Sequence, residues 1–144
     1  MLGVGFLLGT AMTTQAQETE AYMKEQVELA QAGEKLFQSL LTKPDEWGFR
    51  AYGAGRALTE RSQTFNTVTL VINESTGRLS PAGKLFLAKS LRMWIQLTEG
   101  DLETLGKIAG KNPSEDARQV IATGQRVGSR LLGKLRDALK VMES

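Results

Sequence analysis

Three prolines set where this chain can begin a helix, and they divide it into four segments. Pro44 follows Lys43, Pro81 follows Ser80 and Pro113 follows Asn112. Proline is favoured at the first position of a helix, and Ser or Asn is favoured just before it as a cap. The prolines therefore predict four helical segments, over about residues 18–41, 44–73, 80–110 and 112–144.

Apolar residues in the first two segments recur with helical spacing. In the first segment the intervals of three, four or seven gather one set of residues on one face, the apolar side of an amphipathic helix: Met23, Val27, Ala30, Phe37 and Leu41. In the second segment, residues 64–72 (TFNTVTLVI) are β-branched enough to form a strand by propensity. We predict a helix there, because Leu58, Phe65 and Ile72 repeat by seven.

The last two segments carry longer apolar stripes. The third contains six spaced apolar residues and should end at Gly110: Leu87, Leu91, Trp94, Leu102, Leu105 and Ile108. The fourth should begin with Asn112 as a cap, with Glu115 reaching back to it. It has two heptad lines, one through Ile121, Gly128, Leu135 and Met142 and one through Gly124, Leu131 and Ala138.

Glycines on the apolar face of the last segment predict close packing. Glycine costs about 1 kcal/mol inside a helix, so Gly124 and Gly128 are expected where another helix approaches; the alternative is that they are merely tolerated. The whole pattern predicts an all-α fold, a three- or four-helix antiparallel bundle in a single domain.

The N-terminus resembles a secretory signal. Residues 2–12 (LGVGFLLGTAM) form an uncharged apolar run, which is shorter than a membrane-spanning helix. Thr14 and Ala16 are small residues suited to cleavage before Gln17, although no basic residue precedes the run. We therefore expect a signal-like segment at 1–16, a helical domain at 17–144, and a periplasmic or secreted protein without a stable membrane span after cleavage. The alternative is a buried N-terminal segment of a cytoplasmic protein.

The composition argues against catalysis. The chain has no His and no Cys, and its net charge is only +2. The usual zinc ligands, thiolate nucleophiles and proton-transferring imidazoles are therefore absent. We predict a non-enzymatic protein with no catalytic residues, no cofactor and no metal. The acidic residues Glu99, Asp101 and Glu103 alternate along the third segment and are expected to be solvated.

Two sets of residues are candidate partner surfaces. The first is aromatic, with Trp47, Phe49 and Tyr52 set among glycines; the alternative is that these rings dock on the core. The second is a basic stripe of Arg126, Arg130 and Lys134, spaced by four. Such a stripe suits phosphate or an acidic protein surface. The bland alternative is a solvated face paired with acidic residues of the first segment.

Residues 79–121 resemble exported helical proteins encoded in bacterial conjugative-transfer clusters. The likeness lies in two helix starts and the apolar repeat between them: Ser80-Pro81, Leu97, Glu99, Leu102, Leu105, Ser114, Asp116 and Arg118. It implies a non-enzymatic envelope component of a type IV secretion apparatus, similar to a minor pilus subunit. The expected function is protein–protein interaction, with self-association as one form of it. The alternatives are a nucleic-acid-binding protein using the basic last helix, and a bundle that binds a small ligand or acts as an enzyme.

Overall fold

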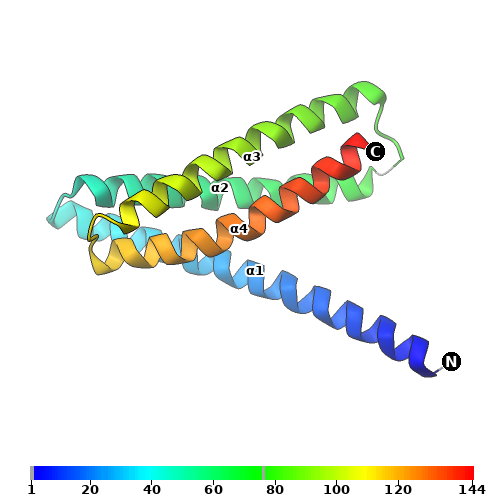
Figure 1. Cartoon of the computed structure of the whole chain (residues 1–144), viewed down its shortest axis with the longest axis horizontal. Helices are drawn as coiled ribbons and strands as arrows, with labels where there is room; N and C mark the ends of the chain where they lie inside the picture. The colour runs from blue at the N-terminus through cyan, green and yellow to red at the C-terminus, as the bar shows by residue number, and fades with distance from the viewer. Residues whose placement is uncertain (1, 76) are drawn as a thin grey trace.

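The chain folds into four helices joined by short turns (Figure 1). The computed structural model describes the backbone of residues 2–75 and 77–144, and the side chains of residues 16–75 and 77–144. The helices are α1 (Leu2–Thr42), α2 (Glu46–Glu74), α3 (Pro81–Ala109) and α4 (Glu115–Glu143). Residues 64–72 are helical, and no strand occurs in the described part of the chain. The all-α bundle predicted from the sequence is confirmed.

The signal-like segment predicted at residues 1–16 lies, apart from Ala16, outside the residues whose side chains are described. The backbone of α1 begins at Leu2, well before the helix start expected near Glu18. Within the described side chains, no helix is apolar over a stretch long enough to cross a bilayer.

Side-chain caps set the starts of the last three helices. Asp45, Ser80 and Ser114 each accept a hydrogen bond from the backbone N–H three residues later, at 3.0, 3.0 and 3.2 Å. The start predicted at Ser80-Pro81 is therefore correct, but the cap predicted at Asn112 is wrong. Asn112 has a φ of 50°, and its side chain accepts a hydrogen bond from Arg118 instead. Ser114 is the cap because its backbone is extended, as a capping residue requires.

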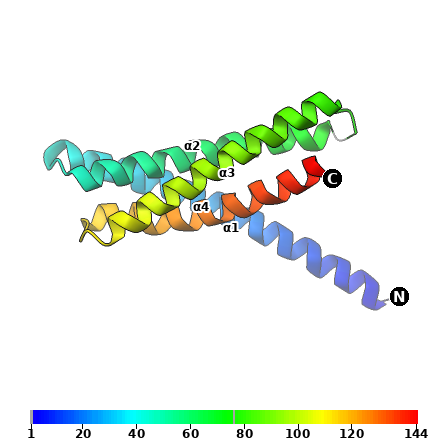
Figure 2. The ribbon, with the colours of Figure 1, turned by 45° about the horizontal axis from the view of Figure 1, so that its top comes forward.

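The four helices form a bundle in which one diagonally opposite pair, α2 and α4, is in direct contact; we term this contact the short diagonal. Helices α2 and α4 pack against each other across the middle, and α1 and α3 lie on opposite sides of that pair. Within the described residues, no Cα atom of α1 lies within 8 Å of a Cα atom of α3. Toward its N-terminus α1 diverges from the other helices, and residues 16–20 are all exposed (Figure 1, Figure 2). One end of the bundle therefore has four helices around its core, and the other end has three.

Gly124 on α4 is the point where all four helices meet. A Cβ atom placed there would lie 2.8 Å from Leu105 Cδ1 of α3, and 3.7 Å from both Leu29 Cδ1 of α1 and Leu58 Cδ1 of α2. These three leucines are almost completely buried. Any larger residue at position 124 would force the buried Leu105 side chain to shift, because a Cβ atom essentially never sits under 3.0 Å from another carbon.

The short diagonal between α2 and α4 depends on glycine on both sides. A Cβ atom at Gly55 of α2 would lie 2.7 Å from Val120 Cγ1 of α4. One turn beyond Gly124, a Cβ atom at Gly128 would lie 2.6 Å from Leu102 Cδ2 and 3.4 Å from Leu58 Cδ2. A side chain at either position would therefore force Val120 or Leu102 to shift.

The buried apolar residues form two clusters along the bundle. The cluster at the four-helix end draws on every helix and includes Leu36, Ala51, Ile108 and Ile121. The cluster at the three-helix end draws only on α2, α3 and α4, and consists of Phe65, Ala88, Leu91, Leu131, Leu135 and Met142. Helix α1 contributes no residue to the second cluster, because it has diverged from the other helices at the three-helix end.

The apolar face predicted for α1 is not the buried one. Tyr22, Leu29, Leu36 and Leu40 face the core and are at most 3% exposed. The predicted face, which we term the outer face of α1, is exposed and consists of Met23, Val27, Ala30, Phe37 and Leu41. Both sets have helical spacing, so α1 is apolar on two sides and periodicity alone could not choose between them.

One acidic residue expected to be solvated is instead half-buried between helices. Asp101 on α3 accepts a hydrogen bond from Arg61 Nη1 of α2 at 2.8 Å, and the same Nη1 lies 3.2 Å from Thr98 Oγ1. The two charged side chains are only 12% and 22% exposed. An ion pair of this kind adds little net stability, but removing one partner leaves the other charge unpaired and costs several kcal/mol.

Gly128 tests the close approach. Gly128→Leu should lower the free energy of unfolding by about 1–3 kcal/mol, because the new side chain overlaps Leu102. Gly133 is the matched control on the same helix, since a Cβ atom there meets nothing within 4 Å. Gly133→Leu should raise stability by a few tenths to about 1 kcal/mol through helix propensity. Urea unfolding of both variants decides the question, and equal stabilities would contradict the packing described.

Candidate docking groove between helices α1 and α2

The outer face of α1 is an apolar surface that the bundle leaves uncovered. Met23, Val27 and Leu41 are 58%, 56% and 68% exposed. With Glu34 included, the six positions from residue 23 to 41 follow intervals of four, three, four, three and four. That is the heptad spacing of a helix seam that packs against another helix.

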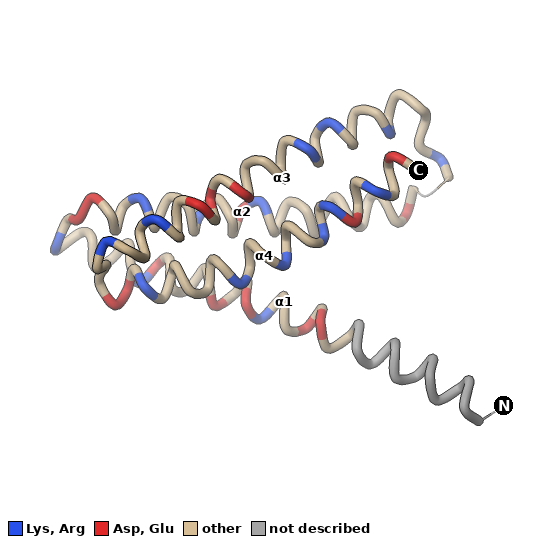
Figure 3. Tube along the Cα trace, in the orientation of Figure 1, with Lys and Arg blue, Asp and Glu red and all other residues tan. Residues whose placement is uncertain are grey.

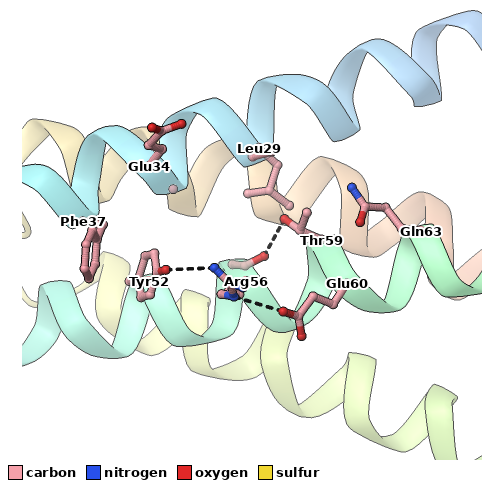
Figure 4. Close-up of a pocket in the computed structure, with 11 residues that line it drawn as sticks. Leu29, Glu34, Phe37, Tyr52, Arg56, Thr59, Glu60 and Gln63 are labelled. Carbon is pink, nitrogen blue, oxygen red and sulfur yellow. Dashed lines mark hydrogen bonds and ion pairs between the residues drawn. The ribbon is translucent and has the colours of Figure 1, made fainter.

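Polar and aromatic residues of α2 form the opposite wall of a groove beside this face. The part of the groove nearer the four-helix end, which we term the lower part, has a volume of about 560 Å³. Helix α2 contributes Tyr52, Arg56, Thr59, Glu60 and Gln63 to it (Figure 4). Arg56 lies between Tyr52 and Glu60 along this wall. Its guanidinium donates to Tyr52 Oη at 3.3 Å and to Glu60 Oε1 at 3.0 Å. The groove therefore presents an ordered row of side chains along one edge.

An aromatic contact closes the bottom of the groove. The rings of Phe37 on α1 and Tyr52 on α2 are tilted by 35°, with centroids 5.3 Å apart. Figure 4 shows them facing each other across the two helices. Aromatic pairs at this spacing are stabilising beyond the area they bury, so this end of the groove is the more firmly held one.

The upper part of the groove is more apolar and is floored by a third helix. Here α1 diverges from α2, and α4 is exposed between them in a hollow of about 660 Å³. Met23 of α1, Phe65 and Leu70 of α2, and Val141 and Met142 of α4 all line it. The groove thus runs along the α1–α2 side of the bundle and widens toward the three-helix end. We term both parts together the α1–α2 groove.

Tyr22 separates the upper groove from the core. Its side chain is buried, and its hydroxyl oxygen has no hydrogen-bond partner among the described atoms. Burial raises the pKa of the Tyr22 hydroxyl above its ordinary value of 10.0, while the nearby polar groups of Gln26 and Ser62 oppose that shift in part. Lys134 of α4 places its ammonium 5.0 Å from the Tyr22 ring centroid, within range of a cation–π interaction.

The basic stripe predicted on α4 is turned partly toward α1. Arg130 donates to Glu25 of α1, with Nε at 2.7 Å from Oε2, and Lys134 lies over Tyr22. Arg126 is exposed. Figure 3 shows basic residues of α4 beside acidic residues of α1. Of the three cations, Arg130 therefore pairs with an acidic residue of α1, whereas Lys134 contacts an aromatic ring of α1.

The three aromatic residues predicted to form one surface lie in three different surroundings. Trp47 packs on the core at the four-helix end, where the Arg50 guanidinium and the Lys111 ammonium lie 5.0 and 5.3 Å from its ring. Phe49 is 48% exposed. Tyr52 alone lines the groove. The structure therefore does not bring these three rings together into one surface.

The sequence interpretation did not identify the groove. Met23, Val27 and Phe37 were recognised as one apolar face, but as the apolar side of an ordinary amphipathic helix. The second apolar set on α1, which includes Leu29, Leu36 and Leu40, was the available signal. One helix with two apolar sides has too much apolar surface for a single core contact.

The described side chains contain no group of three carboxylates, His or Cys that could hold a metal ion. Searches against protein-family models, curated proteins and solved structures find no match to this chain.

Replacing Tyr22 by Phe tests the buried hydroxyl. Tyr22→Phe should keep stability at pH 7 or raise it by up to about 1 kcal/mol, because it removes a buried group without a partner. In the parent, the raised pKa means that the unfolded chain loses this proton first as the pH rises above 10, so stability falls from there upward. The variant should show a smaller loss. Urea unfolding from pH 7 to 11 measures both, and an identical alkaline slope would contradict the assignment.

Proposed function

We propose that this chain is a non-enzymatic helical protein that works by protein–protein contact, taking an α-helix of its partner against the outer face of α1. The observation that carries the proposal is the exposed heptad row from Met23 to Leu41 beside the α1–α2 groove. Amphipathic helices bind apolar grooves in this way, with anchors at intervals of three, four and seven.

The dimensions of the groove support a helical occupant. The row from residue 23 to 41 extends about 28 Å at 1.5 Å per residue, which is about five helical turns. Its walls are apolar on the α1 side and polar on the α2 side, where Arg56 and Glu60 are available at the edge. An apolar centre with a polar rim is the usual anatomy of a protein interface.

Uncovered apolar surface of this extent is costly for an isolated protein. Contiguous exposed apolar patches mark interaction sites in most soluble proteins, whereas scattered single residues do not. The members of the outer face of α1 are stacked turn by turn on one helix, with one interruption at Glu34. The exposed row therefore supports a binding partner that covers the outer face of α1.

The cellular setting proposed is the bacterial envelope. The signal-like run at residues 2–12 and the likeness of residues 79–121 to exported conjugation proteins support it. A component of a multi-protein transfer apparatus needs surfaces that hold neighbours in register, and the outer face of α1 would be such a surface.

Site-specific photo-crosslinking in the native cell tests this proposal. A benzophenone amino acid at Val27 should give an adduct of one discrete size, identified by mass spectrometry, because the position faces the partner. The same probe at Met93 on α3 is the control, since Met93 is also exposed, at 53%, but lies on the other side of the bundle. The absence of adducts from Val27, or equal adducts from Met93, would contradict the proposal.

A further inference from the structure

We infer that the helix which covers the outer face of α1 is α1 of a second copy of this chain, packed antiparallel. This inference rests on the proposed function and names the partner of the same surface. Its basis is that the row from residue 23 to 41 is complementary to itself in side-chain size, and that Arg56 beside the row offers a positive charge to its one charged residue, Glu34.

The size complementarity follows from one antiparallel register. A two-fold axis level with residue 32 places each seam residue opposite a residue of the second copy, with numbers that sum to 64. Met23 then faces Leu41, Val27 faces Phe37, and Ala30 faces Glu34. Each facing pair joins an a position of the heptad in one helix to a d position in the other, as antiparallel helix pairs require. Ala30, the smallest apolar residue of the row, faces Glu34, the only charged one.

The groove side of this arrangement accommodates the charge. Glu34 of the second copy would enter beside Ala30, on the side of the groove where Arg56 lies at mid-height. Arg56 has an exposed guanidinium that already contacts one carboxylate, that of Glu60. A second carboxylate beside it would gain a charge-assisted hydrogen bond.

The other flank opposes no like charges. The residues that would face each other there are Lys24 with Gln38 and Gln31 with Gln31, all of them exposed. At the ends of the seam, Glu20 of one copy would approach Lys43 of the other, which follows the last turn of α1. Opposite charges at the ends favour antiparallel over parallel pairing, because a parallel pair would bring Glu20 to Glu20.

The area sets the expected affinity. A seam of about 28 Å, roughly one helix wide, together with the facing edge of α2, buries on the order of 600 Å² per copy. The total of about 1,200 Å² is at the lower limit for specific, stable interfaces. We therefore expect a reversible dimer with a dissociation constant in the micromolar range.

Sedimentation velocity of the full 144-residue chain, from about 1 to 100 μM, is the first test. The parent should pass from monomer to dimer across this range. Met23→Glu should raise the dissociation constant at least about tenfold, because it buries a charge against Leu41 of the second copy. Met93→Glu is the matched control, with the same change at similar exposure on α3, and should leave the constant within about threefold. Circular dichroism checks that both variants remain helical.

Disulfide trapping tests the register, because the chain has no cysteine of its own. A mixture of Val27→Cys and Phe37→Cys proteins should give a disulfide-linked heterodimer under mild oxidation. Neither variant alone should cross-link efficiently, because ten residues separate Val27 from Phe37 and place like positions about 15 Å apart along the seam. Faster cross-linking of Val27→Cys with itself would show a parallel pair and overturn the inference.

The outcomes separate this inference from the proposed function. If the parent stays monomeric at about 100 μM while Val27 cross-links to a different protein in the cell, the second-copy inference is overturned and the docking role stands. If the parent is monomeric and Val27 gives no adduct, both fail. A dimer weakened equally by Met23→Glu and Met93→Glu would also overturn the inference, because it would move the interface away from α1.

Discussion

The convergence of three leucines on a glycine organises this molecule. Leu29, Leu58 and Leu105 come from α1, α2 and α3, and all three reach Gly124 on α4. Because Gly124 has no side chain, α4 can sit deep among the other helices, and Gly55 lets α2 approach it from the far side. The short diagonal between α2 and α4 is the result.

That diagonal decides what each remaining helix can cover. With α2 and α4 in contact, α1 and α3 are held on opposite sides, and within the described residues their backbones stay more than 8 Å apart, Cα to Cα. Helix α1 therefore has neighbours on only part of its circumference, and one of its two apolar sides is left facing outward. Its divergence toward the N-terminus opens the upper groove, where α4 is exposed as a floor. The same geometry that builds the core thus creates the proposed docking surface.

The sequence predicted the fold well where one pattern had one interpretation. Proline and serine at residues 80–81, the heptads of α4 and the glycine that ends α3 are local signals, and each was placed correctly apart from the cap at Asn112. Prediction from the sequence failed where contacts between helices decide which residues are buried or paired. The choice between the two apolar sides of α1 depends on which one meets Gly55 and Gly124, and the pairing of Asp101 with Arg61 joins residues 40 positions apart. Neither relation appears in the spacing of residues along a single helix.

We expect a partner helix to cover the outer face of α1 in the cell. Oxidative footprinting of methionines in the native cell tests it most directly, because Met23 and Met93 are almost equally exposed in the single chain, at 58% and 53%. Met142, which is buried, is the slow reference. We expect Met93 to be oxidised to the sulfoxide several times faster than Met23. Equal oxidation of Met23 and Met93 would contradict it, because the outer face of α1 would then be open to solvent.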